Sequence, residues 1–368
     1  MPVVLGISAQ ALLVCGYEEI RVLLTGGSFS RAKAAAHGMT SRTPESLALN
    51  SADPPDHARR RGTVAAAFTS ARAEKERAWI RQTAADLLVT MVGLGPPTDL
   101  IAAFSLPLSV AVICRVMGVP AADFPLFSPM FDVMMSTQGY SSQEVAAAHQ
   151  GIFEYFSRLY DRERARLADG EARRGVLTAL VIAAERDGTV TRTEAVHIAY
   201  GLLVAGYETT SKQIATSVLL LLSDRSRWER LPRDPSGMRP AIEETLRWTS
   251  LLATGGVPHV ALGDVILGME QVQAGQILIP VFAAANRDPR VFVDPERLSL
   301  DRADAAHVAF GYGRHLCLGA PLARVELEEA LGALLPGLPG LELGVPEREL
   351  RWREGSFIRG LTTLPVRW

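Results

Sequence analysis

The sequence is poor in cysteine and has no excess of basic residues. Its 368 residues include only 3 cysteines, Cys15, Cys114 and Cys317, and an odd number spread this widely cannot form a disulfide framework. There are 38 lysines and arginines against 40 aspartates and glutamates, which gives a net charge of −2. Domains that bind DNA or RNA usually carry a basic excess, so we expect no nucleic-acid partner.

Long apolar runs and targeting signals are also missing. The stretch Leu100–Cys114 is interrupted by Pro107, and it is shorter than the roughly 18 residues that cross a bilayer. The first residues are apolar, but they have neither the basic start nor the small-residue cleavage site of a secretory signal peptide. The sequence therefore predicts a cytoplasmic protein that is not attached to a membrane.

The sequence does contain helical patterns, which dominate from about residue 58 to residue 250. Residues Val257–Val281 alternate and are punctuated by glycine, which predicts short strands. We find no repeat or linker, so we predict a single domain over residues 1–368, mainly α with a minor β part. The expected helices cover His57–Phe68 with Asp56 as N-cap, Asp123–Met135, Gln143–Ala168, Thr193–Ser223 and Arg239–Thr249.

The most informative segment surrounds the third cysteine. Glycines at positions 311, 313 and 319 suit a tight backbone path, and a helix is expected to follow, with Pro321 in its first turn. Cys317 would then lie beside a helix N-terminus, where free N–H groups stabilise a thiolate. For Cys15 and Cys114 we expect only a packing role.

This segment resembles the haem-binding signature of the cytochrome P450 family, F-x-x-G-x-x-x-C-x-G, with all four fixed positions present: Phe310, Gly313, Cys317 and Gly319. The resemblance implies the cytochrome P450 fold, with haem b as cofactor and Cys317 as its axial thiolate. It also implies that Phe310 and Gly311 lie against the haem on the sulfur side.

A second element lies within the expected helix 193–223. Thr209 can hydrogen-bond to the carbonyl of Ala205 and loosen the helix locally, which taken alone indicates only an irregular core helix. Beside Cys317, the run from Ala205 to Thr210 resembles the family's A-G-x-[DE]-T-T motif. The resemblance implies that Thr209 holds bound dioxygen, that Glu208 helps to deliver protons, and that Ala205 and Gly206 approach the haem.

A third element is Glu244 and Arg247, which share one face of a helix. Such a pair is usually a solvated surface pair. It resembles the family's E-x-x-R, and Arg297 resembles the arginine of the P-x-R that follows. The resemblance implies a structural role for all three residues, in support of the haem-binding loop.

A fourth element is His57 and Arg61, one turn apart and suited to gripping a carboxylate. A solvated basic helix end is the alternative. The resemblance implies that His57, Arg61 and His315 bind haem propionates. His259 stands where the family usually places an arginine, and because histidine titrates near neutrality, we predict that haem retention weakens as His259 loses its proton.

The resemblance runs from about Leu12 to the C-terminus, and the family's leading helix and strand are missing ahead of it. It implies a monooxygenase that inserts one oxygen atom from O2 into a small-molecule or carrier-bound substrate by hydroxylation or epoxidation. The walls of the substrate pocket would include Ala205, Leu252 and Thr254. Electrons would come from a ferredoxin-type donor at a basic face with Arg59, Arg60 and Arg324 as candidates. A peroxide-using or oxidative-coupling variant and a haem-thiolate sensor without turnover are the alternatives.

Overall fold

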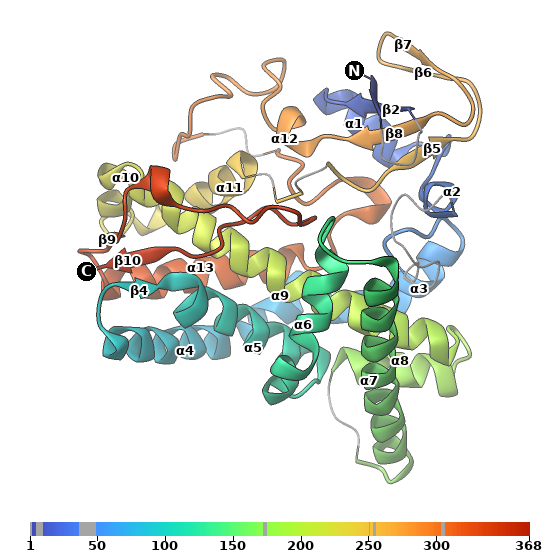
Figure 1. The fold of residues 1–368 in the computed structure, drawn as a ribbon, viewed down its shortest axis with the longest axis horizontal. Coiled ribbons are helices and arrows are strands. Elements are labelled where there is room, and N and C mark those ends of the chain that lie inside the picture. Colours follow the sequence, from blue (N-terminus) through green and yellow to red (C-terminus); the bar gives the residue numbers. More distant parts are fainter. Residues whose placement is uncertain are drawn as a thin grey trace.

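The structure is a computed structural model that describes residues 2–4, 10–36, 49–171, 175–249, 251–252, 255–302 and 306–368. Helices make up most of it, as the sequence predicts (Figure 1). They are α1 (Tyr17–Thr25), α2 (Arg31–Ala36), α3 (Asp56–Ala65), α4 (Ser70–Leu94), α5 (Leu106–Met117), α6 (Phe124–Met135), α7 (Ser142–Ala168), α8 (Val176–Glu185), α9 (Arg192–Leu222), α10 (Arg225–Arg230), α11 (Met238–Trp248), α12 (Phe282–Ala285) and α13 (Ala320–Gly337).

Helix α9 crosses the middle of the molecule (Figure 1) and packs against α5, α7, α8, α11 and α13. It begins at a capping box, in which the Thr191 hydroxyl accepts from the Glu194 N–H and the Glu194 carboxylate accepts from the Thr191 N–H. Apolar side chains on all sides of α9 match its central position. The expected helix 193–223 is therefore confirmed.

The strands form small sheets beside the helices. A five-stranded sheet has the order β1-β2-β8-β5-β3, with β2 parallel to β8 and the other pairs antiparallel. The remaining strands form a sheet in the order β4-β10-β9 and the hairpin β6-β7. The strands are β1 (Pro2–Val4), β2 (Gln10–Val14), β3 (Phe29–Ser30), β4 (Thr98–Asp99), β5 (His259–Ala261), β6 (Val265–Leu267), β7 (Glu270–Val272), β8 (Ile277–Pro280), β9 (Glu342–Leu343) and β10 (Pro365–Arg367).

Two details of the prediction differ from the structure. Strands β1 and β2 form an antiparallel hairpin ahead of α1, so the expectation that a leading strand is missing is wrong. Asp56 is the first residue of α3 and Pro55 is its N-cap, which displaces the predicted cap by one residue. The short strands expected over 257–281 are present as β5 to β8.

A buried ion pair in α11 ties this helix to the segment that follows α12. The Arg247 guanidinium donates from Nε and Nη2 to the two Glu244 carboxylate oxygens at 2.7 and 2.8 Å, and the side chains are only 1% and 2% exposed. Arg247 also donates to the backbone carbonyls of Asn286, Pro295 and Arg297. The pair is therefore structural, and it lies in the interior rather than on the surface.

The expectation for Arg297 needs a correction. Arg297 is exposed and supplies only its backbone carbonyl to Arg247. The guanidinium that completes the network belongs to Arg302, which is 8% exposed and donates from Nε to Glu244 at 3.0 Å. Glu244 therefore accepts from two arginines, and also from the Ser299 N–H.

Across the described parts of the chain, none of the helices is both long and apolar enough to cross a membrane.

The buried pair gives a stability prediction. Arg247→Ala should lower the free energy of unfolding by about 3–5 kcal/mol, because it leaves a buried carboxylate with less compensation. Glu229→Ala is the matched control, since Glu229 pairs with Arg225 at the surface with both side chains over 40% exposed, and it should cost less than about 0.5 kcal/mol. Urea unfolding of both variants measures the difference; equal small losses would contradict a structural role for Arg247.

Candidate functional site

The loop that carries Cys317 has an unusual backbone that glycine permits. Gly311 and Gly313 have φ of +74° and +68°, values that favour glycine. A Cβ at Gly313 would also lie only 3.0 Å from the Leu24 carbonyl oxygen. Gly319 has φ −82° and needs no such freedom. The Cys317 N–H donates to the Phe310 carbonyl at 2.8 Å, which closes the loop just before α13 begins.

Cys317 is exposed as a residue, but its thiol is largely surrounded by protein. This burial raises the pKa of the thiol. The N–H groups of Gly319 and Ala320 and the charges of Arg61 and Arg324 oppose this effect. These donors favour a thiolate, which is the form that binds a metal.

Helix α11 holds both sides of this loop. Ahead of the loop, His307 Nε2 lies 3.0 Å from the Glu243 carboxylate; behind it, Arg324 of α13 donates to the same carboxylate at 2.6 and 2.9 Å. Burial alone would raise the pKa of Glu243, but the bonds from His307 and Arg324 lower it to about 2. Sequence reasoning gave Glu243 no role; its place beside Glu244 on a helix was the available signal.

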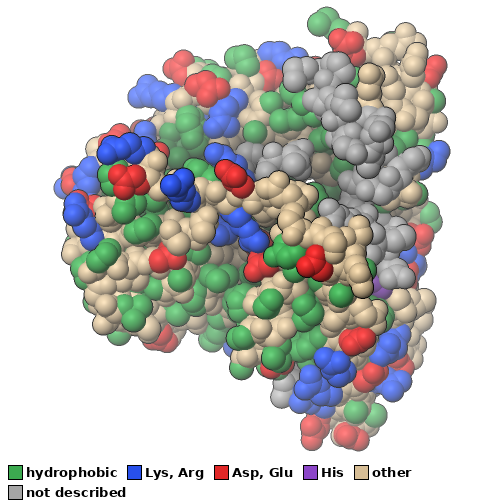
Figure 2. All heavy atoms as spheres, viewed as in Figure 1, with side chains coloured by type: hydrophobic (Ala, Val, Ile, Leu, Met, Phe, Trp, Pro, Cys, Tyr) green, Lys and Arg blue, Asp and Glu red, His purple; other side chains and the backbone are tan. Residues whose placement is uncertain are grey.

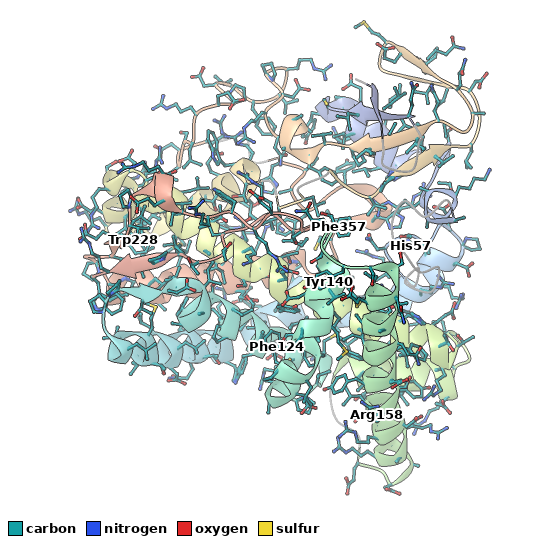
Figure 3. The ribbon with its side chains drawn as sticks, in the orientation of Figure 1. His57, Phe124, Tyr140, Arg158, Trp228 and Phe357 are labelled. Atoms are coloured by element: carbon teal, nitrogen blue, oxygen red, sulfur yellow. The ribbon has the colours of Figure 1, made fainter. Side chains whose placement is uncertain are left out.

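Four predicted residues meet near Cys317, together with two arginines that sequence reasoning missed. The His57 and His315 rings lie 4.0 Å apart, and Arg61 Nη2 donates to the Leu316 carbonyl at 2.8 Å. Figure 3 shows His57 on α3. We call the group the basic cluster: His57, Arg61, His259, His315, Arg31 and Arg314.

The Arg31 guanidinium supplies a positive charge at the place where the family usually has an arginine and this chain has His259. Strand β3 pairs with β5 in the register Ser30↔Val260, so Arg31 follows directly beside His259. Its guanidinium is buried and donates from Nε to His259 Nε2 at 3.1 Å. No local pattern connects positions 31 and 259 in the sequence, which explains why Arg31 was missed.

His259 is neutral, which corrects the predicted pH dependence. Burial and the charge of Arg31 lower the pKa of His259 to about 3, so the ring has no proton to lose near neutrality. Because Nε2 accepts from Arg31, the ring proton is on Nδ1. That Nδ1 is buried; the Val257 backbone approaches the ring, but no described residue makes a hydrogen bond of good geometry with Nδ1.

The basic cluster has donors that fit carboxylates. His57 Nε2 is a second buried atom without a partner, and burial with nearby arginines lowers the pKa of His57 to about 4. The nearby acid is Asp53, whose oxygens already accept from the Ser30 hydroxyl and the Arg31 N–H. Buried polar groups require partners, so a group with two carboxylates beside Cys317, such as haem, fits these residues.

In α9, the predicted hydrogen bond is present: the Thr209 hydroxyl donates to the Ala205 carbonyl at 2.7 Å. Ala205 is exposed although it lies in a buried helix, so it faces open space. Gly206, the next residue, is partly exposed. A Cβ there would lie 2.5 Å from Ile113 of α5, so this glycine serves helix packing.

Glu208 is buried, and burial raises its pKa, an effect that Arg353 opposes. Arg353 Nη1 donates to Glu208 Oε1 at 3.1 Å. Arg353 is 145 positions away in the chain, and sequence reasoning missed it.

The remaining predicted residues are the expected substrate contacts and the arginines expected on a basic face. Leu252 forms an isolated bridge with Ile358, while Thr254 lies outside the described residues. Arg59 and Arg60 both pair with Glu194, and Arg324 pairs with Glu243. The three arginines expected on a basic face are therefore compensated within the chain, and Figure 2 shows both signs of charge interspersed on the face it presents.

Comparison with known proteins gives clear matches. The sequence matches the family described as Cytochrome P450 over residues 108–233 and 238–337. It is 40% identical to the mycinamicin IV hydroxylase/epoxidase of Micromonospora griseorubida over 98% of this chain and 90% of that protein. Identity to the nocardicin C N-oxygenase of Nocardia uniformis subsp. tsuyamanensis is also 40%, over 97% and 89%. The solved structure of the LnmA cytochrome P450 hydroxylase of Streptomyces atroolivaceus is similar with a TM-score of 0.89 at 37% identity, covering 100% of this chain and 92% of that one.

The protonation state of His259 can be tested directly. The ring should remain neutral from about pH 8 to about pH 5, well above its lowered pKa of about 3. Arg31→Gln should raise the pKa of His259, because it removes the nearest positive charge. Imidazole NMR shifts of histidine-labelled protein report both, with exposed Arg72→Gln as control; a wild-type ring that titrates near its usual value of about 6.5 would contradict this arrangement.

Proposed function

Because the chain belongs to the cytochrome P450 family, we propose that it acts as a single-domain, cytoplasmic haem-thiolate monooxygenase. It would insert one oxygen atom from O2 into a secondary metabolite by hydroxylation or epoxidation. The observation that carries this proposal is Cys317 on its glycine-rich loop at the start of α13, next to a basic cluster with unpartnered buried nitrogens.

The residues near Cys317 would hold the haem. Cys317 would supply the thiolate ligand, and Phe310 would shield it; the Arg324 guanidinium lies 4.6 Å from the Phe310 ring centroid. The basic cluster receives the propionates, with Arg31 and Arg61 as cations and the imidazoles as hydrogen-bond donors. Haem bound in this way supplies dioxygen activation, because an electron-rich sulfur ligand favours O–O cleavage.

The polar groups of α9 would move protons. The Thr209 hydroxyl lies one turn from exposed Ala205 and can turn from the Ala205 carbonyl toward the open side. Glu208, the residue before Thr209, is a buried carboxyl whose raised pKa suits it to carry a proton near neutrality. This intact acid–alcohol pair favours ordinary dioxygen use over the peroxide-using alternative.

Substrate and electron donor are proposed by class. The two relatives named above act, by their names, on mycinamicin IV and nocardicin C, which supports a small-molecule or carrier-bound secondary metabolite here. Ala205 and Leu252 would contact it. Three separated cysteines cannot hold an iron–sulfur cluster, so we propose a ferredoxin-type donor.

Spectroscopy of the reduced protein with CO tests the thiolate. The wild type should give the absorption band typical of a thiolate-bound haem, and Cys317→His should lose it because the sulfur ligand is gone. Cys15→Ser is the matched control, since Cys15 is also exposed, contrary to its expected packing role, and is not part of the loop. An unchanged band in Cys317→His would refute the assignment.

Removing the positive charge at Arg31 and restoring it at position 259 tests whether the basic cluster holds the haem propionates. Arg31→Ala should speed haem transfer to apomyoglobin by about ten- to a hundred-fold, because it removes a charge-assisted hydrogen bond worth about 1.5–3 kcal/mol. Adding His259→Arg in the same chain should restore slow transfer by returning a cation to that place. Arg72→Ala, on the exposed face of α4, is the control; failure of both changes to alter transfer would exclude Arg31 from propionate binding.

A further inference from the structure

The C-terminal loop around Arg353 and the end of α6 are joined over α9. The Thr137 N–H donates to the Gly355 carbonyl at 2.8 Å, and the Phe357 N–H donates to the Met135 carbonyl at 2.9 Å. The end of α6 and this loop are therefore placed together by backbone hydrogen bonds.

Arg353 connects this junction to α9. Its Nη1 donates to Glu208 of α9 and its Nη2 to Asp132 of α6, each at 3.1 Å. Its backbone N–H is fixed by the Gly360 carbonyl at 2.8 Å. One guanidinium thus bonds two carboxylates: Glu208, with a 6% exposed side chain, and Asp132, with a 53% exposed one.

Other charged groups near Glu208 are engaged elsewhere or lie farther away. Lys212, one turn along α9, donates from Nζ to the Leu361 carbonyl at 2.7 Å. Its pKa is lowered by burial, while the charges of Glu208 and Asp99 oppose that shift. Tyr207 is buried, and burial raises the pKa of its hydroxyl, so it stays neutral. Arg353 is therefore the cation bonded to Glu208 among the described residues.

The geometry separates two side chains that are neighbours in the sequence. The Thr209 hydroxyl donates to Ala205, while the Glu208 carboxylate accepts from Arg353. A carboxylate held by a guanidinium is stabilised in its charged form. Glu208 can pass on a proton only after it has taken one up. The contact with Arg353 therefore controls how readily Glu208 holds a proton that it can deliver.

We propose that Arg353 is a positioning residue that orients Glu208 and sets its protonation, and that Asp132 of α6 competes for the same guanidinium. The placement of α6 is thereby coupled to proton delivery. This inference rests on the proposed function of Glu208. The proton leaves the Glu208 carboxyl toward Thr209 and the open side of α9, and it is replaced from solvent through the partly exposed Arg353 junction.

Loss of the Arg353 charge and loss of the Asp132 charge should shift the pKa of Glu208 in opposite directions. Arg353→Gln removes the charge that lowers the pKa of Glu208, so this pKa should rise by about 1 to 3 units. Asp132→Asn removes a negative charge that raises it and frees Arg353 for Glu208, so the pKa should fall. A purely structural disturbance of the loop would move both variants in the same direction.

Difference infrared spectroscopy of the substrate-free holoenzyme measures this pKa. The protonated carboxyl stretch of Glu208, assigned by its loss in Glu208→Gln, is titrated in each variant. Arg353→Lys should stay close to the wild type because it keeps the charge. The matched controls are Arg359→Gln and Glu354→Gln, exposed charges of the same loop, and neither should shift the titration.

The rate at which the reduced holoenzyme consumes dioxygen, in H2O and in D2O, is the second readout. Opposite shifts in Arg353→Gln and Asp132→Asn, with matching displacement of the pH profile of this rate, would support the coupling. Shifts of the same sign, or none, would overturn it. If Glu208→Gln left the rate and its solvent isotope effect unchanged, the proposed role of Glu208 would fail, whatever the titrations of Arg353 variants showed.

Discussion

The buried charges of α11 are the interaction on which the candidate site depends. An ion pair taken out of water is tolerated only when further hydrogen bonds compensate both partners. Glu244 and Arg247 meet this need with carbonyls and an N–H from the segment 286–299. That segment in turn fixes the Cys317 loop, because Asn286 Oδ1 accepts from the Val308 N–H at 2.7 Å. One helix thereby sets the geometry before and after the cysteine.

The charge of the basic cluster is compensated from within only in part: Asp53 lies near the Arg31 guanidinium, which also donates to the backbone and side-chain oxygens of Asn50. Arg31 is buried among imidazoles whose pKa values are lowered by burial and by the neighbouring arginines. Neutral imidazoles donate and accept without adding charge, so they allow a buried guanidinium to stay ionised and well placed. His259 therefore orients Arg31. A histidine at position 259, where the family usually has an arginine, leaves β5 without that positive charge, and Arg31, the first residue of α2 directly after β3, supplies one beside it.

The sequence predicted features that depend on short spacing. The Cys317 loop, the Thr209–Ala205 hydrogen bond and the pairing of Glu244 with Arg247 each lie within a few residues, where backbone geometry fixes what can meet. The fold class followed from the length and periodicity of the helices. Long helices such as α7 and α9 carry enough pattern to be recognised without knowledge of their neighbours.

Contacts across the chain could not be predicted in the same way. Arg31 meets His259 through a two-residue strand, too short to show a pattern. Arg302 takes the place expected for Arg297, because the path of the chain after α12 brings Arg302 rather than Arg297 to Glu244, at 3.0 Å. Gly206 packs on Ile113, a choice that depends on the approach of α5. Arg59, Arg60 and Arg324 are compensated by acids that only the tertiary structure brings near them.

Buried glutamates within this one chain show how a cation decides protonation. Glu243, bonded by Arg324 and His307, has its pKa lowered to about 2 and is ionised. Among the described residues, Glu326 has the Ser109 hydroxyl as its one hydrogen-bond partner, at 2.5 Å, and burial raises the pKa of Glu326 to about 8, so it is neutral. Glu208 lies between these cases: burial raises its pKa, but Arg353 shares its guanidinium with Asp132 and compensates only in part. A carboxyl fully compensated would hold no proton, and one without a cation would not release it. A shared arginine is therefore the arrangement that leaves Glu208 able to do both.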